Sequence, residues 1–391
     1  MSPQAKREYM EKMYLRYKRA KSRSEKSSII TELCLTCDWH RKHAIRALKN
    51  FRRFTKPKPR KRGRPSKYNK PSVIEPLKRI WLAANLPCSK RLKAILPLWL
   101  PAYAKEFGGL SVDVIKALLS ISASSIDRCL EPARVRYRGR GRATTKPGTL
   151  LRQHIPVKCN QWEESKPGFL EADTVAHCGD TVDGQYANTI DSVDIATGWT
   201  EQRAVWGRGE TGVLEQIKDI EKSLPFLLLG FDSDNGSEFL NWHLFKHFTG
   251  KKAPVQFTRS RAYHKDDNAH VEQKNWTHVR LWFGYHRIEN PKAVELMNEL
   301  YTSDAWRLYH NFFLPSVKLI EKKRVASKTV KRYDKPKTPY QRLLESPDIE
   351  LSVKRALKEQ YMAANPFRFR KMIEQKLKEI FALCYPKTFK R

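Results

Sequence analysis

The sequence predicts a multidomain protein: α-helical modules at the amino-terminal end, then an α/β domain with a mixed sheet, then a basic helical region. Three observations predict this. The chain has 391 residues, too many for one ordinary core. Helical periodicity marks the first 135 residues, and from about residue 165 the chain becomes rich in strand-like runs of β-branched and aromatic residues.

The charge of the chain indicates a polyanionic partner. Lys and Arg number 76 and Asp and Glu number 41, so 76 − 41 gives a formal net charge of +35. Nucleic acid fits this surplus, because each neutralised phosphate releases condensed counterions. A membrane fits less well, since the longest apolar stretches, 95–101 and 226–231, are far shorter than the roughly 20 residues of a membrane span. No signal peptide is recognisable and the seven cysteines are an odd number, so we predict a soluble, cytoplasmic protein with reduced thiols and no membrane partner.

Residues 1–50 are predicted to form a helix-turn-helix module. Two short amphipathic helices flank a break at 35–38, and the second carries Trp39, Arg41 and Arg46. A plain basic helical bundle is the alternative. The same stretch holds Cys34, Cys37, His40 and His43, whose residue types suit zinc, but they lack the long intervening segment that normally folds around the metal.

Residues 51–70 form a basic linker that has ten basic residues and no acidic one. Within it, Arg62-Gly63-Arg64-Pro65 is similar to an AT-hook, in which two arginines lie in the narrow minor groove of A·T-rich DNA. We therefore interpret Arg62 and Arg64 as DNA-binding residues. A simple tether is the alternative.

Residues 71–135 are predicted to form a second helical module, again with a helix-turn-helix pattern around a break at 120–122. A second basic linker at 136–160 follows it and contains Arg138, Arg140 and Arg142. Two such modules in series would bind a long, bipartite DNA site.

Residues 161–290 are predicted to form one α/β domain with a mixed sheet covered by helices. The strands and helices alternate with Gly, Asp and polar breaks. The predicted strands are 168–175, 186–195, 200–206, 226–233 and 255–258, and the predicted helices are 211–223 and 268–285.

Three acidic residues occupy distinct places on this frame. Asp173 lies within the first strand, Asp234 directly follows the fourth strand, and Glu272 lies in the last helix. Strand ends and a helix laid across them can bring these carboxylates together, although they are 61 and 38 positions apart. Asp232 is the nearest alternative to Asp234, and each acid taken alone could be an ordinary capping or solvated carboxylate.

The segment Asp234-Asn235-Gly236, with Phe239 after it and a helical Val271-Glu272, resembles the catalytic core shared by retroviral integrases and DDE transposases of bacterial insertion sequences. The stretch 259–275 is particularly similar to the bacterial enzymes, and the likeness extends over most of the chain. One departure is Trp276, which stands where retroviral integrases place a DNA-contacting lysine.

The resemblance implies a ribonuclease H-like fold for the core and a DNA transposase or integrase, that is, a DDE-type polynucleotidyl transferase. Phosphodiester cleavage and strand transfer need an in-line attack on phosphorus, and two Mg²⁺ (or Mn²⁺) ions can stabilise both the attacking and the leaving oxygen. By resemblance, Asp173 would bridge the two ions, Asp234 would complete one metal site and Glu272 the other.

Further residues are predicted, by resemblance and by position, to orient DNA at the site: Asn235, His264, Lys265 and Lys274. Ordinary loop or helix-surface chemistry is the alternative for each. The implied partners are double-stranded DNA, as transposon ends and as target, and further copies of the chain, since two ends must be cut and joined together. The implied location is the bacterial nucleoid.

Residues 291–391 are predicted to form a basic helical region, in which the basic strip 318–337 separates helical stretches. It would bind DNA or contact other subunits, or simply pack on the core. Two alternative functions remain for the whole chain. One is a catalytically silent, site-specific DNA-binding regulator derived from a transposase, and the other is a ribonuclease H-like nuclease that hydrolyses DNA without joining it.

Overall fold

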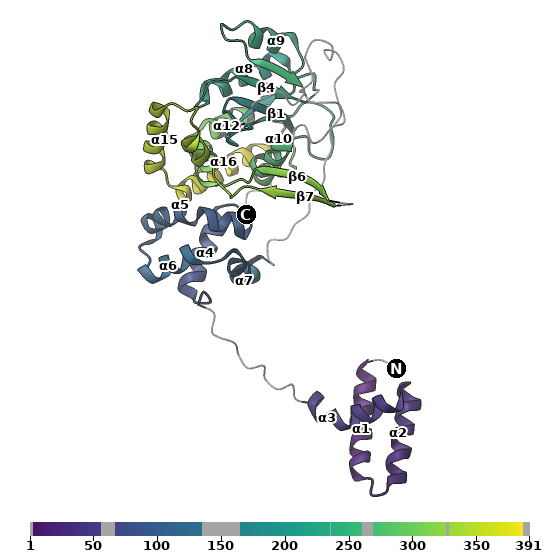
Figure 1. Cartoon of the computed structure of the whole chain (residues 1–391). Coiled ribbons are helices and arrows are strands. Elements are labelled where there is room, and N and C mark those ends of the chain that lie inside the picture. Colours follow the sequence, from purple (N-terminus) through teal and green to yellow (C-terminus); the bar gives the residue numbers. More distant parts are fainter. Residues whose placement is uncertain are drawn as a thin grey trace. The chain divides into compact units, whose positions relative to one another are not determined.

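The chain folds as two units, residues 1–66 and residues 67–391 (Figure 1). The computed structural model describes residues 3–55, 67–134, 165–234, 236–259, 269–325 and 328–385. Within these residues, no helix is long and apolar enough to cross a membrane.

The first unit consists of three helices: α1 Pro3–Arg19, α2 Arg23–Cys37 and α3 Arg41–Thr55. A capping box starts α2, because Ser22 accepts a hydrogen bond from the backbone of Glu25 and the Glu25 side chain returns one to the backbone of Ser22. Asp38 ends α2 in the left-handed conformation, with φ at 55°. This is the break that the sequence predicts between the two helices, and Leu33 is fully buried beside it.

The second unit begins with four helices: α4 Pro71–Ala83, α5 Ser89–Phe107, α6 Val112–Ser120 and α7 Ala123–Arg134. The gap between α6 and α7 coincides with the predicted break at 120–122. These helices share one apolar core with the later helices of the unit. Trp99 in α5 is fully buried, and its indole nitrogen donates to the carbonyl oxygen of Phe313 at 3.1 Å.

A five-stranded sheet forms the centre of the second unit, in the order β3-β2-β1-β4-β5. Strands β1, β2 and β3 pair antiparallel, whereas β4 and β5 run parallel to β1. The prediction of a mixed sheet is therefore confirmed. The strands are β1 Phe169–Ala176, β2 Ala187–Asp194, β3 Thr200–Trp206, β4 Gly230–Ser233 and β5 Gln256–Arg259.

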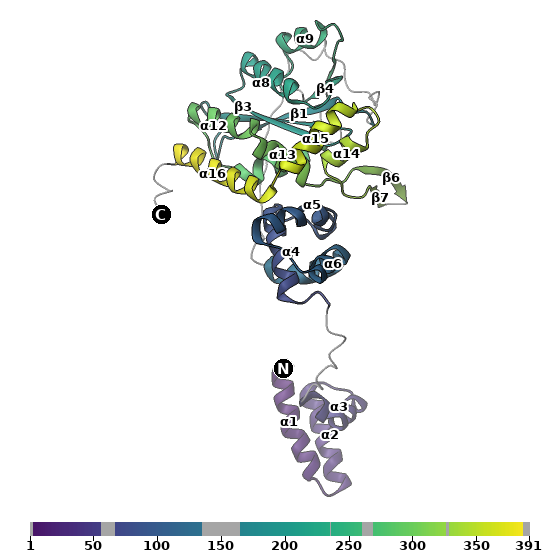
Figure 2. The ribbon, with the colours of Figure 1, turned by 90° about the vertical axis from the view of Figure 1, so that its left-hand side faces the viewer.

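Helices cover both faces of this sheet (Figure 2). Because side chains alternate along a strand, Leu170 and Ala172 pack toward α8 Glu210–Ser223 and α9 Trp242–Thr249. Val175 belongs to the core of the opposite face. The elements of that face are α10 Ala269–Lys274, a π-helical segment Asn275–Arg280, α11 Leu281–Phe283, α12 Pro291–Thr302 and α13 Asp304–Phe313.

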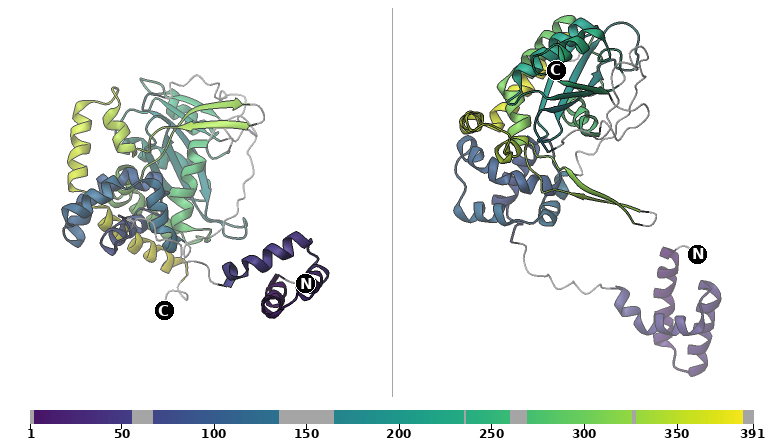
Figure 3. Two further views of the ribbon diagram at one scale, coloured as in Figure 1. Left: turned by 60° about the horizontal axis from the view of Figure 1, so that its bottom comes forward. Right: turned by 45° about the horizontal axis from the view of Figure 1, so that its top comes forward.

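The carboxyl-terminal region is helical except for a two-stranded hairpin, β6 Leu319–Val325 and β7 Lys328–Tyr333. The sequence predicts a basic strip at 318–337 and does not predict these two strands. Lysine and arginine occupy so many positions that they hide the period-two pattern, and Ile320 and Val330 are exposed rather than buried. The hairpin projects from the side of the second unit (Figure 3). The helices that follow are α14 Pro339–Glu345, α15 Leu351–Ala363 and α16 Pro366–Cys384.

We expect Trp99→Ala to lower the free energy of unfolding of the second unit by about 3–5 kcal/mol, because it removes a buried indole and its hydrogen bond. Chemical denaturation followed by circular dichroism measures this. Leu119→Ala is the control on α6, since Leu119 is 46% exposed and its loss should cost less than about 0.5 kcal/mol. Equal effects of the two substitutions would show that α5 does not share the core of the sheet domain.

Candidate active site

Asp173 lies in the middle of β1, on the face of the sheet that α10 covers. Its carboxylate is half-buried and accepts two hydrogen bonds, from the backbone nitrogen of Thr174 at 2.8 Å and from Nδ2 of Asn275 at 2.6 Å. Asp191 stands directly opposite on β2. The strand backbone and the π-helical segment that holds Asn275 thus each donate one hydrogen bond that orients the Asp173 side chain.

The strand register places Asp234 next to Asp173. Ala172 of β1 pairs with Ser233 of the parallel strand β4, so the following residue of each strand is an aspartate. The backbone nitrogen of Gly236 donates to Oδ1 of Asp234 at 2.9 Å. A Cβ at Gly236 would lie 2.9 Å from that oxygen and 2.6 Å from Oε2 of Glu238, so a larger residue there would displace one or both carboxylates.

Glu272 is exposed on α10, and the start of this helix is anchored by β1. Oε2 of Glu171 accepts hydrogen bonds from the backbone nitrogens of His270 at 3.2 Å and Val271 at 3.3 Å. Glu171 is 1% exposed and shares its face of the sheet with Asp173, two positions along the strand. A carboxylate at a helix amino terminus also complements the helix dipole. Glu171 therefore positions the helix that carries Glu272.

The carboxylates of the site repel one another. Burial, opposed by the hydrogen bonds from Asn275 and Thr174, raises the pKa of Asp173 to about 6, with further increases from Glu238 and Glu272. Burial and the charge of Asp173 raise the pKa of Asp234 to about 7. Asp173 therefore lies within electrostatic reach of both other acids that the sequence singles out, Asp234 and Glu272.

Glu238 is a fourth acid at the site, to which the sequence analysis gave no role. Only 3% of its surface is exposed. Its Oε1 accepts a hydrogen bond from Oγ1 of Thr174 at 2.7 Å and lies 3.5 Å from Nη1 of Arg208. Its position four residues after Asp234, in the turn that follows β4, is the feature of the sequence that could have indicated Glu238.

The donor set of the site suits a hard divalent cation. Carboxylate oxygens are the preferred ligands of Mg²⁺ and Mn²⁺, and a cation would offset the repulsion that raises the pKa of Asp173 and of Asp234. In the part of the chain that the structure describes, no three His, Cys, Asp or Glu side chains form a ready-made metal shell. The chemistry of the donors fits, and the side chains would have to converge further to share an ion.

Asp232, the nearest alternative to Asp234, has a structural environment. It is fully buried in β4 and accepts a hydrogen bond from the hydroxyl of Thr258 on β5. The Asp232 side chain therefore links β4 to β5.

Several predicted DNA-binding residues lie outside the described residues: Arg62, Arg64, Asn235, His264 and Lys265. Lys274 is described, and it is only 8% exposed. Burial, opposed by the nearby charge of Asp191, lowers its pKa to about 8. Lys274 therefore faces the interior beside the sheet rather than the exposed side of α10 where Glu272 lies.

We expect the stability of the metal-free protein to fall as the pH rises from 4 to 8, relative to Asp234→Asn. An acid whose pKa is raised in the folded state binds more protons when folded, so its contribution to stability is lost as pH rises through that window. Asparagine never ionises, so the free energy of unfolding of the variant relative to that of the wild type should rise by at least about 1 kcal/mol between pH 4 and pH 8. Thermal unfolding across pH measures this, with the exposed Asp180→Asn as control. Parallel curves for wild type and Asp234→Asn would contradict the repulsion described above.

The comparisons with solved structures give weak likenesses. The catalytic core domain of the BIV integrase is 16% identical, with a TM-score of 0.28, and the match covers 46% of this chain and 95% of that one. The simian T-cell lymphotropic virus intasome in complex with the PP2A regulatory subunit B56 gamma gives 12% identity and a TM-score of 0.31, over 62% of this chain and 73% of that one.

No family model matches the chain. A curated relative, the uncharacterized protein y4rM of Sinorhizobium fredii, is 38% identical over 337 residues. The match covers 86% of this chain and 94% of that protein. The chain belongs to the same family as y4rM.

Proposed function

We propose that the chain is a DDE-type DNA transposase or integrase that cleaves the ends of a mobile DNA element and joins their 3′-hydroxyl groups to target DNA. One observation carries this proposal: Asp173 lies in one strand, Asp234 directly follows the adjacent parallel strand, and Glu272 lies on a helix anchored to the first strand, so Asp173 is within electrostatic reach of both other acids. Three such carboxylates suit metal-dependent phosphoryl transfer.

Asp173, Asp234 and Glu272 would hold two Mg²⁺ or Mn²⁺ ions, which supply Lewis-acid stabilisation of the attacking and leaving oxygens when bound. The protein's own groups keep the acids in place. Asn275 and the backbone of Thr174 orient Asp173, Gly236 orients Asp234, and Glu171 fixes the start of the helix that carries Glu272. Glu238, held by Thr174 and Arg208, is a positioning residue beside Asp234.

Double-stranded DNA is the proposed partner. The net charge of +35 supplies strong attraction to phosphate. The helices of both units would read the end sequences as helix-turn-helix modules, with Arg62 and Arg64 reaching the minor groove between them. Two copies of the chain would be needed to cut and join two ends together.

We expect Asp234→Asn and Glu272→Gln to lower strand transfer by about 10²-fold or more, because each removes one charge from the reacting centre. The assay uses the DNA that flanks the gene as candidate ends, a plasmid as target, and Mg²⁺ or Mn²⁺. Affinity for the end DNA should change by less than about threefold, since neither side chain is proposed to bind DNA directly. Asp180→Asn is the matched control: it removes an exposed acid and should retain full activity.

Other outcomes of this assay would favour the alternatives. Tight binding of the ends by the wild type, without cleavage or joining under any metal, would favour a DNA-binding regulator. Metal-dependent hydrolysis without joined products would favour a nuclease. Equal loss of binding and cleavage in Asp234→Asn would contradict the role assigned to this aspartate.

A further inference from the structure

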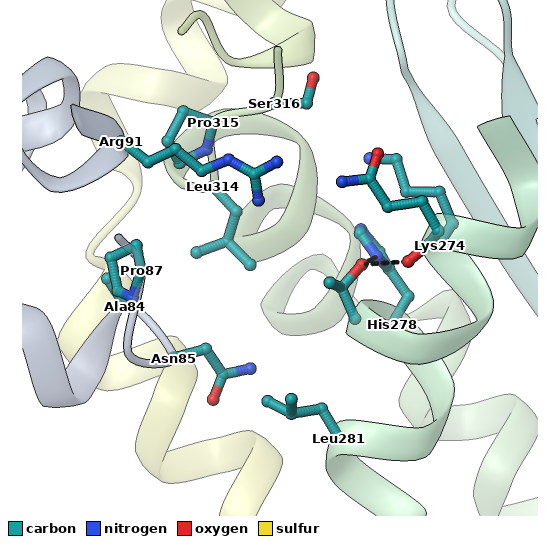
Figure 4. A pocket seen from close by; sticks show the side chains of 12 residues that line it. Ala84, Asn85, Pro87, Arg91, Lys274, His278, Leu281, Leu314, Pro315 and Ser316 are labelled. Carbon is teal, nitrogen blue, oxygen red and sulfur yellow. Dashed lines mark hydrogen bonds between the residues drawn. The ribbon is translucent and has the colours of Figure 1, made fainter. Parts of the chain in front are cut away.

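A cavity of about 90 Å³ opens on the second unit, between the helical segment α4 to α7 and the helix that carries Glu272 (Figure 4). We call it the Arg91 pocket. Its walls are the turn between α4 and α5, the first turn of α5, the residues 273–281 and the loop after α13. A single water needs about 10–15 Å³ measured in this way, so the pocket has room for several waters or for one tetrahedral oxyanion.

Two cationic side chains line the Arg91 pocket from opposite sides. Arg91 extends from α5 toward the wall that holds Lys274 (Figure 4). Lys274 is 8% exposed, so its basic side chain lines the pocket from a nearly buried position. Among the described residues, neither side chain forms a hydrogen bond or an ion pair, and no carboxylate lines the pocket.

A third cation lies behind the pocket wall. Arg342 of α14 is 8% exposed and donates to the carbonyl oxygen of Ser316, a wall residue, at 3.2 Å. Asp334 neutralises it, at 2.7 Å. The charge of Arg342 still lowers the pKa of Lys274, as does that of Arg91. Asp191 is an acid whose charge reaches Lys274, but it does not line the pocket. The opening of the pocket is therefore electropositive.

The turn that forms one wall holds a strained backbone. Asn85 and Leu86 have φ values of 66° and 56°, in the left-handed region that side chains other than glycine seldom adopt. For leucine this conformation is strained, because its Cβ crowds the following carbonyl oxygen. The surrounding contacts hold it: Oδ1 of Asn85 accepts from Nη1 of Arg370 at 2.6 Å, and Trp81 donates to the carbonyl oxygen of Pro87 at 3.2 Å. The fold thus keeps the wall in a fixed shape at an energetic cost.

We propose that the Arg91 pocket binds a phosphate group, held by the guanidinium of Arg91 and the ammonium of Lys274. Arginine suits a phosphate because its donors form a fork, and lysine adds a point charge. The phosphate could belong to a DNA backbone or to a free inorganic anion. This proposal goes beyond the proposed function, because phosphate binding in the pocket requires neither a metal ion nor DNA cleavage. Since Lys274 is two residues from Glu272, a DNA phosphate here would tie the helical segment to the catalytic helix.

The test is calorimetric titration of the metal-free full-length chain with inorganic phosphate at constant ionic strength. We expect Arg91→Gln to weaken phosphate binding by about tenfold, the effect of losing one charged hydrogen bond. Lys93→Gln is the matched control, because it removes the same charge from an exposed position two residues along α5. Arg91→Lys should restore part of the affinity. Arg91 is half-buried and forms no hydrogen bond or ion pair with the described part of the chain, so its replacement should leave the melting temperature unchanged.

A second titration distinguishes the sources of the phosphate. The salt dependence of affinity is measured for a duplex made from the DNA that flanks the gene. A slope that falls by about one counterion in Arg91→Gln, beyond any change in Lys93→Gln, identifies a backbone phosphate. A slope equal to that of the control, with weakened inorganic phosphate binding, identifies a free anion. If Arg91→Gln and Lys93→Gln bind inorganic phosphate equally well, the proposal is wrong, whatever the strand-transfer assay shows.

Discussion

The site depends on how one strand face holds one helix. Glu171 and Asp173 occupy the same face of β1, two positions apart, and each receives hydrogen bonds from the helical stretch that starts at Ala269. Glu171 fixes the start of α10 through two backbone nitrogens, and Asn275 reaches back to Asp173 one turn later. Glu272 lies between these two attachments, so its distance from the strand is set by the sheet. Any loosening of β1 would move Glu272 away from Asp173 and Asp234 together.

This arrangement opposes the stability of the fold. The alternating pattern that buries Leu170 and Ala172 on one face places Glu171 and Asp173 on the other, and Asp173 shares its surroundings with Asp191, Asp234 and Glu238. Ionised carboxylates without enough cationic partners are costly to bury. The protein supplies hydrogen-bond donors to several of them, and two cations lie near them: Arg208 beside Glu238 and Lys274 near Asp191. The remaining repulsion is the kind of strain that persists where an incoming cation relieves it.

The sequence was sufficient for the mixed sheet and for the positions of the three acids on it, because strands with strong period-two or apolar patterns sit between clear breaks. It was not sufficient for three features. The role of Glu171 depends on the start of α10 packing against β1, and that of Glu238 on the turn after Asp234 packing against β1. Neither contact can be recognised in the sequence, where these residues resemble other acidic residues nearby. The described side chains of the hairpin β6–β7 do not form a buried face, so its sequence has no alternation of apolar and polar residues that would predict strands. Lys274 is predicted to orient DNA at the site, but its side chain is buried. The π-helical turn after Lys274 and the Arg91 pocket beside it form only when the unit packs, so the sequence does not predict them.

The shared core of the second unit gives the pocket its significance. The helical segment α4 to α7 might have been joined to the sheet domain by a linker alone, but Trp99 and Tyr309 bind it to α13 through hydrogen bonds to Phe313 and Ala83. A rigid joint fixes the distance between Arg91 on α5 and Lys274 on α10, and a pair of cations at fixed distance selects one kind of ligand far better than two mobile ones. The same joint would pass a displacement at the pocket to α10. Because the start of α10 donates hydrogen bonds to Glu171 and the helix carries Glu272, a ligand on Lys274 acts directly on the helix that positions Glu272.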